Sequence, residues 1–152
     1  MSISRREIVD CARSFVGTPF VDKGRGKGRG IDCVGLPLMI GGELGLVDTG
    51  GQPINGQTYK AYAAQPVTGV VRELCSKHLV RKALEERKPG DIVLMRFMGT
   101  PTCHVGIYAG EVDGVSYLIH AYATAGKCVE QPIDDRWWRF IVAIYSYPGI
   151  EE

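Results

Sequence analysis

Apolar residues near the start of the chain recur at the spacing of an amphipathic helix. The pattern Ser4-x-x-Glu7 is typical of a capping box, in which a serine and a glutamate close the first turn. After it, apolar side chains follow at intervals that place them on one helix face: Ile8, Cys11, Ala12, Phe15 and Val16. We therefore predict a first helix that stops at Gly17, before Thr18-Pro19.

A second helix is predicted after Asp32, because aspartate is a favoured N-cap residue and an apolar run follows it. This helix should cover residues 33–46, with a kink near Pro37, whose missing N–H removes a hydrogen bond. Glycine, proline and asparagine recur in residues 47–69, which favours an extended surface segment. A third helix is expected over about 69–86.

The second half of the chain shows the apolar runs and alternation of β-strands. After a turn at Lys88-Pro89-Gly90-Asp91, strands are expected over residues 92–97, 103–111, 115–122, 127–132 and 139–146. Val112-Asp113-Gly114 predicts a three-residue hairpin loop with its glycine in the left-handed conformation. Helices first and an antiparallel sheet afterwards indicate the α+β class.

Composition narrows the class of protein. The chain has 152 residues, of which 45% are hydrophobic and 23% charged, and its formal net charge is +1. This length predicts a single domain over residues 1–152 with a sizeable core. The ample apolar fraction argues against disorder. The balanced charge argues against nucleic-acid binding by gross electrostatics, since no excess of cations neutralises phosphates.

The first residues and the cysteines bear on the compartment. Met1-Ser2-Ile3-Ser4 leads into charged positions without an apolar stretch, so we expect no signal peptide and synthesis in the bacterial cytoplasm. No run approaches the ~20 apolar residues of a membrane span. The five cysteines include no Cys-x-x-Cys pair, which predicts free thiols. We expect neither a metal site nor a cofactor.

Cys33 stands where a thiol could act as a nucleophile. As the first helical residue it would lie beside unpaired backbone N–H groups, which stabilise a thiolate. The carboxylate of Asp32 has the opposite electrostatic effect, so it should bond the helix amides instead of approaching the sulfur. A lone cysteine at a helix start is more often a small buried residue, so its partners decide between the two interpretations.

Two histidines are expected to share one face of the predicted hairpin. With a three-residue loop, the numbers of paired residues sum to 226, so that His104 faces Tyr122 and Gly106 faces His120. The two imidazoles are then diagonal neighbours at roughly 7–8 Å, whereas a loop of even length would put them on opposite faces. His104 could serve as general base for Cys33, with His120 fixing its tautomer. For either ring alone, a satisfied and partly buried histidine is the alternative interpretation.

Several motifs, taken in order, resemble the NlpC family of papain-like cysteine peptidases. They are Asp32-Cys33-Val34-Gly35-Leu36, Pro89-Gly90-Asp91, His104-Val105-Gly106-Ile107-Tyr108 and Ile119-His120-Ala121. The resemblance extends from Gly17 to about Tyr147. It implies a papain-like, NlpC-like α+β fold, in which N-terminal helices carrying the nucleophile Cys33 pack on an antiparallel sheet carrying His104 and His120.

The resemblance also implies an activity and a setting. The family cleaves amide bonds in bacterial peptidoglycan peptides, typically between D-glutamate, through its γ-carboxyl, and diaminopimelate or lysine. Gly17-Thr18-Pro19-Phe20 and the basic loop after it are similar to compact versions in tails of bacteriophages and gene transfer agents. The expected partners are therefore the wall peptide and other tail or baseplate proteins. The site of action would be the periplasm or cell wall, reached by delivery in the particle.

Two positions depart from the family pattern. Val34 stands where many relatives have serine, and Phe20 stands where many have tyrosine. Asp32, Val34 and Phe20 are the candidates for contacts with the substrate or the oxyanion, and the oxyanion would rest on backbone N–H groups, including that of Cys33. The missing hydroxyls leave room for the first of two alternatives, and the second rests on the scaffold alone. One is a structural tail component that has lost activity, and the other is an acyltransferase or toxin effector on the same scaffold.

Some further signals carry their own expectations. The glycine- and cation-rich segment 23–30 lacks the Gly-Lys-Ser/Thr ending of nucleotide loops. It is expected to be a flexible solvated loop, or else a mobile wall of the substrate cleft or a contact for an acidic partner. Cys103 should be core, because it points away from the face of its neighbour His104. Trp137-Trp138 should be a core anchor and an exposed ring, and His78 should lie on a solvated helix face.

Overall fold

A computed structural model of the chain describes residues 2–56, 59, 67–97 and 103–152. Its helices are α1 (Arg5–Arg13), α2 (Gly35–Leu44), α3 (Val67–His78) and α4 (Asp135–Phe140). None of the helices in these ranges is long and apolar enough to cross a membrane.

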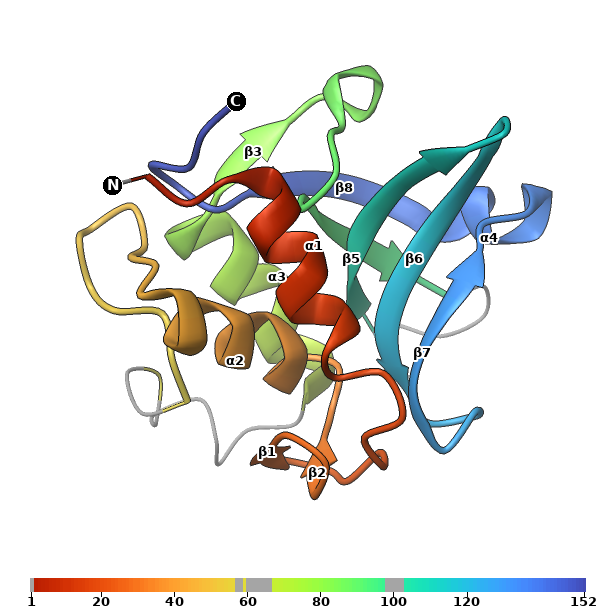
Figure 1. Cartoon of the computed structure of the whole chain (residues 1–152), viewed down its shortest axis with the longest axis horizontal. Helices are drawn as coiled ribbons and strands as arrows, with labels where there is room; N and C mark the ends of the chain where they lie inside the picture. The colour runs from red at the N-terminus through yellow and green to blue at the C-terminus, as the bar shows by residue number, and fades with distance from the viewer. Residues whose placement is uncertain (1, 57–58, 60–66, 98–102) are drawn as a thin grey trace.

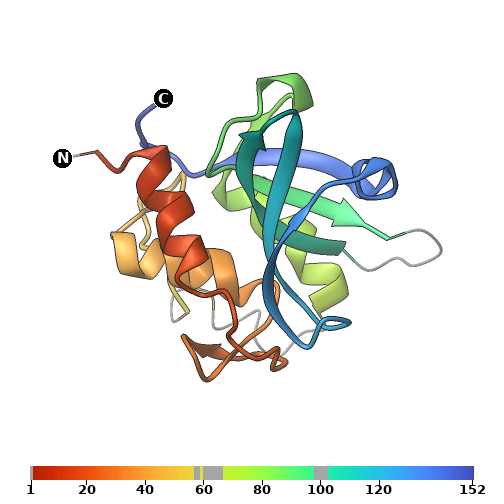
Figure 2. The ribbon, with the colours of Figure 1, turned by 45° about the vertical axis from the view of Figure 1, so that its right-hand side comes forward.

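The strands form one large sheet and one small ribbon. The strands of the sheet are β3 (Val80–Lys82), β4 (Ile92–Arg96), β5 (Cys103–Val112), β6 (Val115–Tyr122), β7 (Lys127–Pro132) and β8 (Ile141–Ser146). They are antiparallel, in the order β3-β8-β4-β5-β6-β7. The ribbon pairs β1 (Arg25–Gly26) with β2 (Gly30–Ile31). Helices α1 to α3 gather on one side of the sheet and α4 lies on the other (Figures 1 and 2), which confirms the predicted α+β class.

Each face of the sheet has its own core, because successive strand residues point to opposite sides. On the side of α1 to α3, the buried strand residues include Ile92, Leu94, Val105, Ile107 and Ile119. On the side of α4, they include Val93, Met95, Tyr108, Leu118 and Ile144, together with Trp137 of the helix.

Helix α1 begins as predicted. The Oγ atom of Ser4 accepts from Glu7 N at 3.1 Å, and Ser4 N donates to Glu7 Oε2 at 2.7 Å, so the capping box is complete. The regular helix ends at Arg13, and turns continue to Gly17, whose φ is 94°. Val16, expected on the buried face, is exposed because it lies beyond the helix.

Helix α2 begins two residues later than predicted, and Pro37 is the reason. The amide N–H groups on either side of this proline donate to carbonyls four residues back, both at 3.3 Å. Pro37 has no N–H for the carbonyl of Cys33, so the helical ladder is interrupted there. The continuous helix therefore starts at Gly35, and Pro37 lies in its first turn instead of five residues inside it. Cys33 lies in the turn before the helix.

Other helix boundaries also differ from the prediction. Helix α2 ends at Leu44, where Gly45 adopts a left-handed φ of 67°. Helix α3 ends at His78, because residues 80–82 pair with β8 instead of continuing the helix. Helix α4 was not predicted, although Asp134 marks its start by accepting from Trp137 N at 3.0 Å.

The turn of the β5–β6 hairpin is shorter than predicted. Asp113 and Gly114 form a two-residue loop in which both residues have positive φ, of 52° and 80°, and Val112 pairs with Val115. The predicted three-residue loop is therefore wrong. A loop of even length alone would reverse the faces of the two histidines.

A β-bulge restores the predicted register beyond the turn. The pairing shifts between Tyr108 and Gly110, which leaves Ala109 as the extra residue on β5. Past the bulge, Ile107 pairs with Ile119, so that the residue numbers again sum to 226. The end of the hairpin that carries the histidines thus has the expected pairing.

Candidate active site

Two imidazole rings meet on the face of the sheet that α4 covers. The Nε2 atom of His104 lies 2.7 Å from the Nδ1 atom of His120, and both side chains are buried. Gly106 leaves room for this contact, because an added Cβ would lie 3.0 Å from the Cβ of His120 and 2.7 Å from Leu118 Cδ1. The predicted contact between the two rings is confirmed.

A third side chain, Gln131 of β7, continues the row. Its Oε1 atom lies 2.7 Å from the Nε2 atom of His120. The sequence analysis missed this residue, although a signal was available. The turn over residues 123–126 pairs His120 with Val129, which makes Gln131 a diagonal neighbour on the same face.

Burial keeps both rings neutral. It lowers the pKa of His104 to about 3, and the adjacent His120 adds to this effect. It lowers the pKa of His120 to about 4, while the hydrogen bond with Gln131 acts in the opposite direction. A neutral imidazole keeps one nitrogen with a free lone pair, so His104 is able to accept a proton.

Aromatic side chains enclose the two imidazoles. Tyr122 stacks on His120 with ring centroids 5.0 Å apart, and Trp137 meets the same ring edge-on at 5.3 Å. The ring of Phe97 lies 5.4 Å from that of His104. This packing orients the imidazoles and provides the apolar surroundings that disfavour their charged forms.

Cys33 lies beside β5, next to the backbone of Val105. Burial raises the pKa of the Cys33 thiol to about 12, and the charge of Asp32 adds to the rise. The backbone N–H groups of Val105, Val34 and Cys33 act on the sulfur in the opposite direction. Because Val105 directly follows His104, the thiol approaches the same end of β5 as the histidine pair. Among the described residues, no hydrogen bond joins the sulfur to either imidazole, and the groups that bond the sulfur are backbone N–H groups.

Asp32 holds the ribbon against the start of α2. Its Oδ1 atom accepts from Gly35 N and from Arg25 Nη1, and its Oδ2 atom accepts from Lys23 N, each at 2.8 Å. The carboxylate thus bonds a helix amide, as expected. The Asp32 side chain is buried, and the three groups that bond its carboxylate belong to this chain. Asp32 therefore stabilises the turn that carries Cys33.

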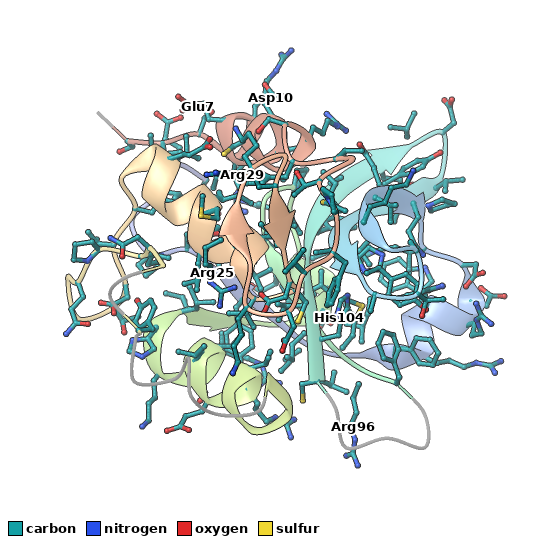
Figure 3. All side chains as sticks on the ribbon, turned by 90° about the horizontal axis from the view of Figure 1, so that it is seen from below. Glu7, Asp10, Arg25, Arg29, Arg96 and His104 are labelled. Atoms are coloured by element: carbon teal, nitrogen blue, oxygen red, sulfur yellow. The ribbon has the colours of Figure 1, made fainter. Side chains whose placement is uncertain are left out.

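The segment 23–30 contains the ribbon of β1 and β2, and its Lys27, Gly28 and Arg29 are exposed, as expected for a solvated loop. Lys27 pairs with Glu43 at 2.8 Å, and Gly28 N donates to Thr18 Oγ1 at 3.0 Å. Figure 3 views the molecule from the side of this ribbon, where Arg25 and Arg29 lie, with His104 to one side. The ribbon therefore forms a fixed border beside the turn of Cys33.

The two departures from the family pattern place apolar side chains near the site. Val34 is buried and lines, with Pro37 and Val105, a cavity of about 50 Å³. Phe20 is half-buried and packs against the main core. Neither offers a polar group, so an oxyanion would meet backbone N–H groups, and those of Cys33 and Val34 already lie beside the sulfur.

His78 does not lie on a solvated helix face. Its Nδ1 atom lies 2.9 Å from Asp48 Oδ2, and its ring packs on Tyr59 with centroids 4.7 Å apart. It is half-buried in a polar cluster at the end of α3, and it lines the same cavity as Val34 and Val105.

The remaining expectations about side chains are settled by burial. Cys103 is buried, as predicted for its face of β5. Trp137 is the expected core anchor, but Trp138 is half-buried under the guanidinium of Arg87, 4.6 Å from its ring centroid, instead of exposed. Across the described ranges, no three or more histidine, cysteine or acidic side chains form a group that could hold a metal ion.

The chain is similar to known proteins in structure. No protein-family model and no curated protein matches it. The NlpC/p60 domain of the peptidoglycan hydrolase SagA is 22% identical, with a TM-score of 0.60 over 95% of this chain and 99% of that one. An NlpC/P60 family protein from Bacillus cereus is 20% identical, with a TM-score of 0.66 over 97% of this chain and 41% of that one. An N-acetylmuramoyl-L-alanine amidase from Bacteroides uniformis is 14% identical, with a TM-score of 0.56 over 94% and 98%.

Proposed function

Because the chain has the papain-like fold of the NlpC/p60 domains, we propose that it is a cysteine peptidase acting on stem peptides of bacterial peptidoglycan. The observation that carries the proposal is the hydrogen-bonded pair of His104 and His120 at the end of β5 that Cys33 approaches. Two of the similar structures are a peptidoglycan hydrolase domain and an N-acetylmuramoyl-L-alanine amidase, which supports a cell-wall substrate.

In the proposed reaction Cys33 is the nucleophile and His104 is the general base. His104 takes the thiol proton while Sγ bonds the carbonyl carbon of the substrate. Burial raises the pKa of the thiol and lowers that of the imidazole, so both groups rest neutral and the proposed proton transfer takes place as the sulfur attacks. The developing charge on the carbonyl oxygen is stabilised by the backbone N–H groups of Cys33 and Val34.

The second half of the reaction returns the enzyme to its starting state. The imidazolium of His104 gives its proton to the leaving amine as the C–N bond breaks, which leaves a thioester on Cys33. Water then loses a proton to His104 and attacks the thioester carbonyl. The C–S bond breaks, the acid is released, and the thiolate recovers the proton from His104. No group besides the substrate and water is needed to balance these steps.

The proposed scissile bond joins the γ-carboxyl of D-glutamate to diaminopimelate. This part of the proposal rests on the resemblance of the motifs around Cys33, His104 and His120 to the NlpC family. Incubation of the purified protein with defined muropeptides, followed by mass spectrometry of the products, tests it directly. Cleavage at another amide bond would keep the cysteine mechanism and overturn this assignment.

We predict that Cys33→Ala lowers the turnover of muropeptides by on the order of 10³-fold or more, because it removes the nucleophile. Cys128→Ala is the matched control, since Cys128 is a buried cysteine of β7 outside the site, and it should keep activity. Initial rates with one muropeptide measure both variants. Equal rates for Cys33→Ala and the unmodified chain would refute the cysteine mechanism.

A structural role without catalysis is the second candidate, favoured by the apolar side chains of Val34 and Phe20. It predicts no product from any muropeptide even though the chain is folded. An acyltransferase would instead form a product only when an amine acceptor is supplied, and a toxin effector would have a cognate inhibitor. The muropeptide assay with and without added amine separates hydrolysis, acyl transfer and inactivity.

We further propose that a phage-like tail carries the protein to the cell wall, where it binds other tail or baseplate proteins. The support is the similarity of Gly17-Thr18-Pro19-Phe20 and segment 23–30 to compact tail-borne versions of the family. Mass spectrometry of purified particles from the producing strain tests this proposal. Particles that lack the chain would refute it and leave the chemistry untouched.

A further inference from the structure

His120 is an interior link in a row of three polar side chains. Its Nδ1 atom faces His104 Nε2 and its Nε2 atom faces Gln131 Oε1, both at 2.7 Å. Both ring nitrogens are therefore occupied. Tyr122 stacks on the His120 ring and Trp137 meets the ring edge-on, so the rest of the ring is surrounded by aromatic carbon.

The amide oxygen at one end gives the row a direction. An amide oxygen accepts hydrogen bonds and does not donate them, so the Nε2 atom of His120 must carry its proton. A neutral imidazole has a single N–H, so the Nδ1 atom of His120 is an acceptor. It therefore receives the N–H of His104 Nε2. This leaves the Nδ1 atom of His104 without a proton.

We infer that Gln131 is a positioning residue that sets the tautomers of both histidines and thereby leaves the basic lone pair of the row on Nδ1 of His104. The tautomer assignment stands on the contacts alone, and its consequence for catalysis rests on the proposed function. If the direction were reversed, His104 would carry its proton on Nδ1 and have no lone pair there for a thiol proton.

Because the two rings are buried, one tautomer of each must be selected by a neighbouring group. In water the two neutral tautomers of an imidazole exchange readily, but His120 is fully buried and His104 almost so. Burial also lowers the pKa of each ring, so protonation does not offer a route between tautomers at neutral pH. The hydrogen bond that His120 Nε2 donates to Gln131 Oε1 is then the interaction that distinguishes the two directions.

Nitrogen-15 NMR of the histidine rings tests the tautomers without any assay of activity. At pH 7 we expect His104 and His120 both to be protonated on Nε2 in the unmodified chain. Gln131→Glu keeps an oxygen acceptor of the same size and should keep this pattern. Gln131→Leu removes the acceptor and should produce a mixture of tautomers. Protonation of His104 on Nδ1 in the unmodified chain, or an unchanged pattern in Gln131→Leu, would overturn the inference.

Kinetics with a muropeptide tests the catalytic consequence. Gln131→Leu should lower kcat on the order of 10–100-fold, as loss of partners that orient functional histidines does elsewhere, with little change in KM. Gln131→Glu should restore kcat. Its carboxylate raises the pKa of the rings, so the acid limb of the pH profile should move to higher pH. Gln52→Leu, the same change in an exposed turn, should leave kcat and the pH profile unaltered.

The two measurements distinguish failure of the inference from failure of the proposed function. If the unmodified chain cleaves no muropeptide, the proposed function fails and the NMR experiment still decides the role of Gln131. If the unmodified chain is active and Gln131→Leu matches it in kcat and pH profile, the inference fails alone. Should Gln131→Leu not fold, the ring pattern of the unmodified chain and the rescue by Gln131→Glu still decide.

Discussion

The resting charge of His104 and His120 depends on their burial. Water cannot solvate a charge on either ring, and no carboxylate among the described contacts compensates for this loss, so both stay neutral. The same two histidines in the unfolded chain are hydrated and bind protons near their ordinary pKa. Burial of the pair therefore couples the stability of the fold to pH, as well as tuning the proposed base.

We predict that the free energy of unfolding falls as the pH is lowered from about 6.5, the ordinary histidine pKa. The folded chain holds these pKa values at about 3 and about 4. Between the folded and unfolded values the unfolded state binds more protons, so stability is fully present above pH 6.5 and is lost below it. The loss is at most about 1.4 kcal/mol per pH unit for each ring. Urea unfolding at pH 7, 6 and 5 measures it.

The control for this prediction removes the titrating groups. A double variant, His104→Gln with His120→Gln, should show a shallower dependence on pH over the same range. Cys128→Ala should lower stability without changing the dependence, because this buried thiol does not ionise between pH 5 and 7. A double variant with the slope of the unmodified chain would contradict the assignment.

Among the elements, the turn between β2 and α2 decides where the thiol lies. Pro37 interrupts the helical ladder and leaves Cys33 in a turn, where its sulfur meets the backbone of Val105. Asp32 then ties this turn to the ribbon through Lys23 and Arg25. The ribbon, the turn of Cys33 and the start of α2 thus all meet at the buried carboxylate of Asp32, and together they set the position of the proposed nucleophile.

We predict that Asp32→Ala destabilises the fold by about 2–4 kcal/mol, because it leaves a guanidinium and two backbone N–H groups without their acceptor. Asp32→Asn keeps one acceptor oxygen and should cost less. Urea unfolding measures both changes. The matched control is Glu73→Ala, which removes an exposed ion pair with Lys77 and should cost at most about 0.5 kcal/mol. Equal losses for Asp32→Ala and Glu73→Ala would contradict the role of Asp32.

For the molecule as a whole, one buried carboxylate joins the first helix to the sheet. Asp91 Oδ1 pairs with Arg5 of α1 at 2.7 Å, and Asp91 Oδ2 pairs with Lys82 of β3 at 2.8 Å. Arg5 also pairs with Glu152, which brings both ends of the chain to this corner of the molecule (Figure 2). The cluster joins α1 to β3 and to the residue that precedes β4.

We predict that Asp91→Ala destabilises the fold by about 3–5 kcal/mol, since it leaves the nearly buried Lys82 without its carboxylate and Arg5 with only the exposed Glu152. The melting temperature and urea unfolding measure the loss. Glu152→Ala removes an exposed partner of the same arginine and should cost at most about 1 kcal/mol. A small effect of Asp91→Ala, close to that of Glu152→Ala, would refute the role of the cluster.

The parts of the candidate site that were predictable are those encoded by spacing. His104 and His120 could be paired because strand alternation and a short turn determine which side chains share a face. The predicted turn was nevertheless wrong, and the pairing held because a bulge at Ala109 offsets the shorter loop. The same pairing rule, applied to the β6–β7 hairpin, places Gln131 diagonally from His120 on the same face. The start of α2 was misplaced because the cap signal of Asp32 was given more weight than Pro37.

The sequence by itself determined the succession of N-terminal helices and later strands, the capping box of α1 and the alternation of side chains along β5 and β6. These features depend on residues a few positions apart or on the two-residue repeat of a strand. Only the tertiary structure decided that Cys33 meets Val105 and that both imidazoles are sufficiently buried to stay neutral. Contacts between distant segments and the exclusion of water both arise from the packing of the whole chain. A local sequence pattern does not predict that packing.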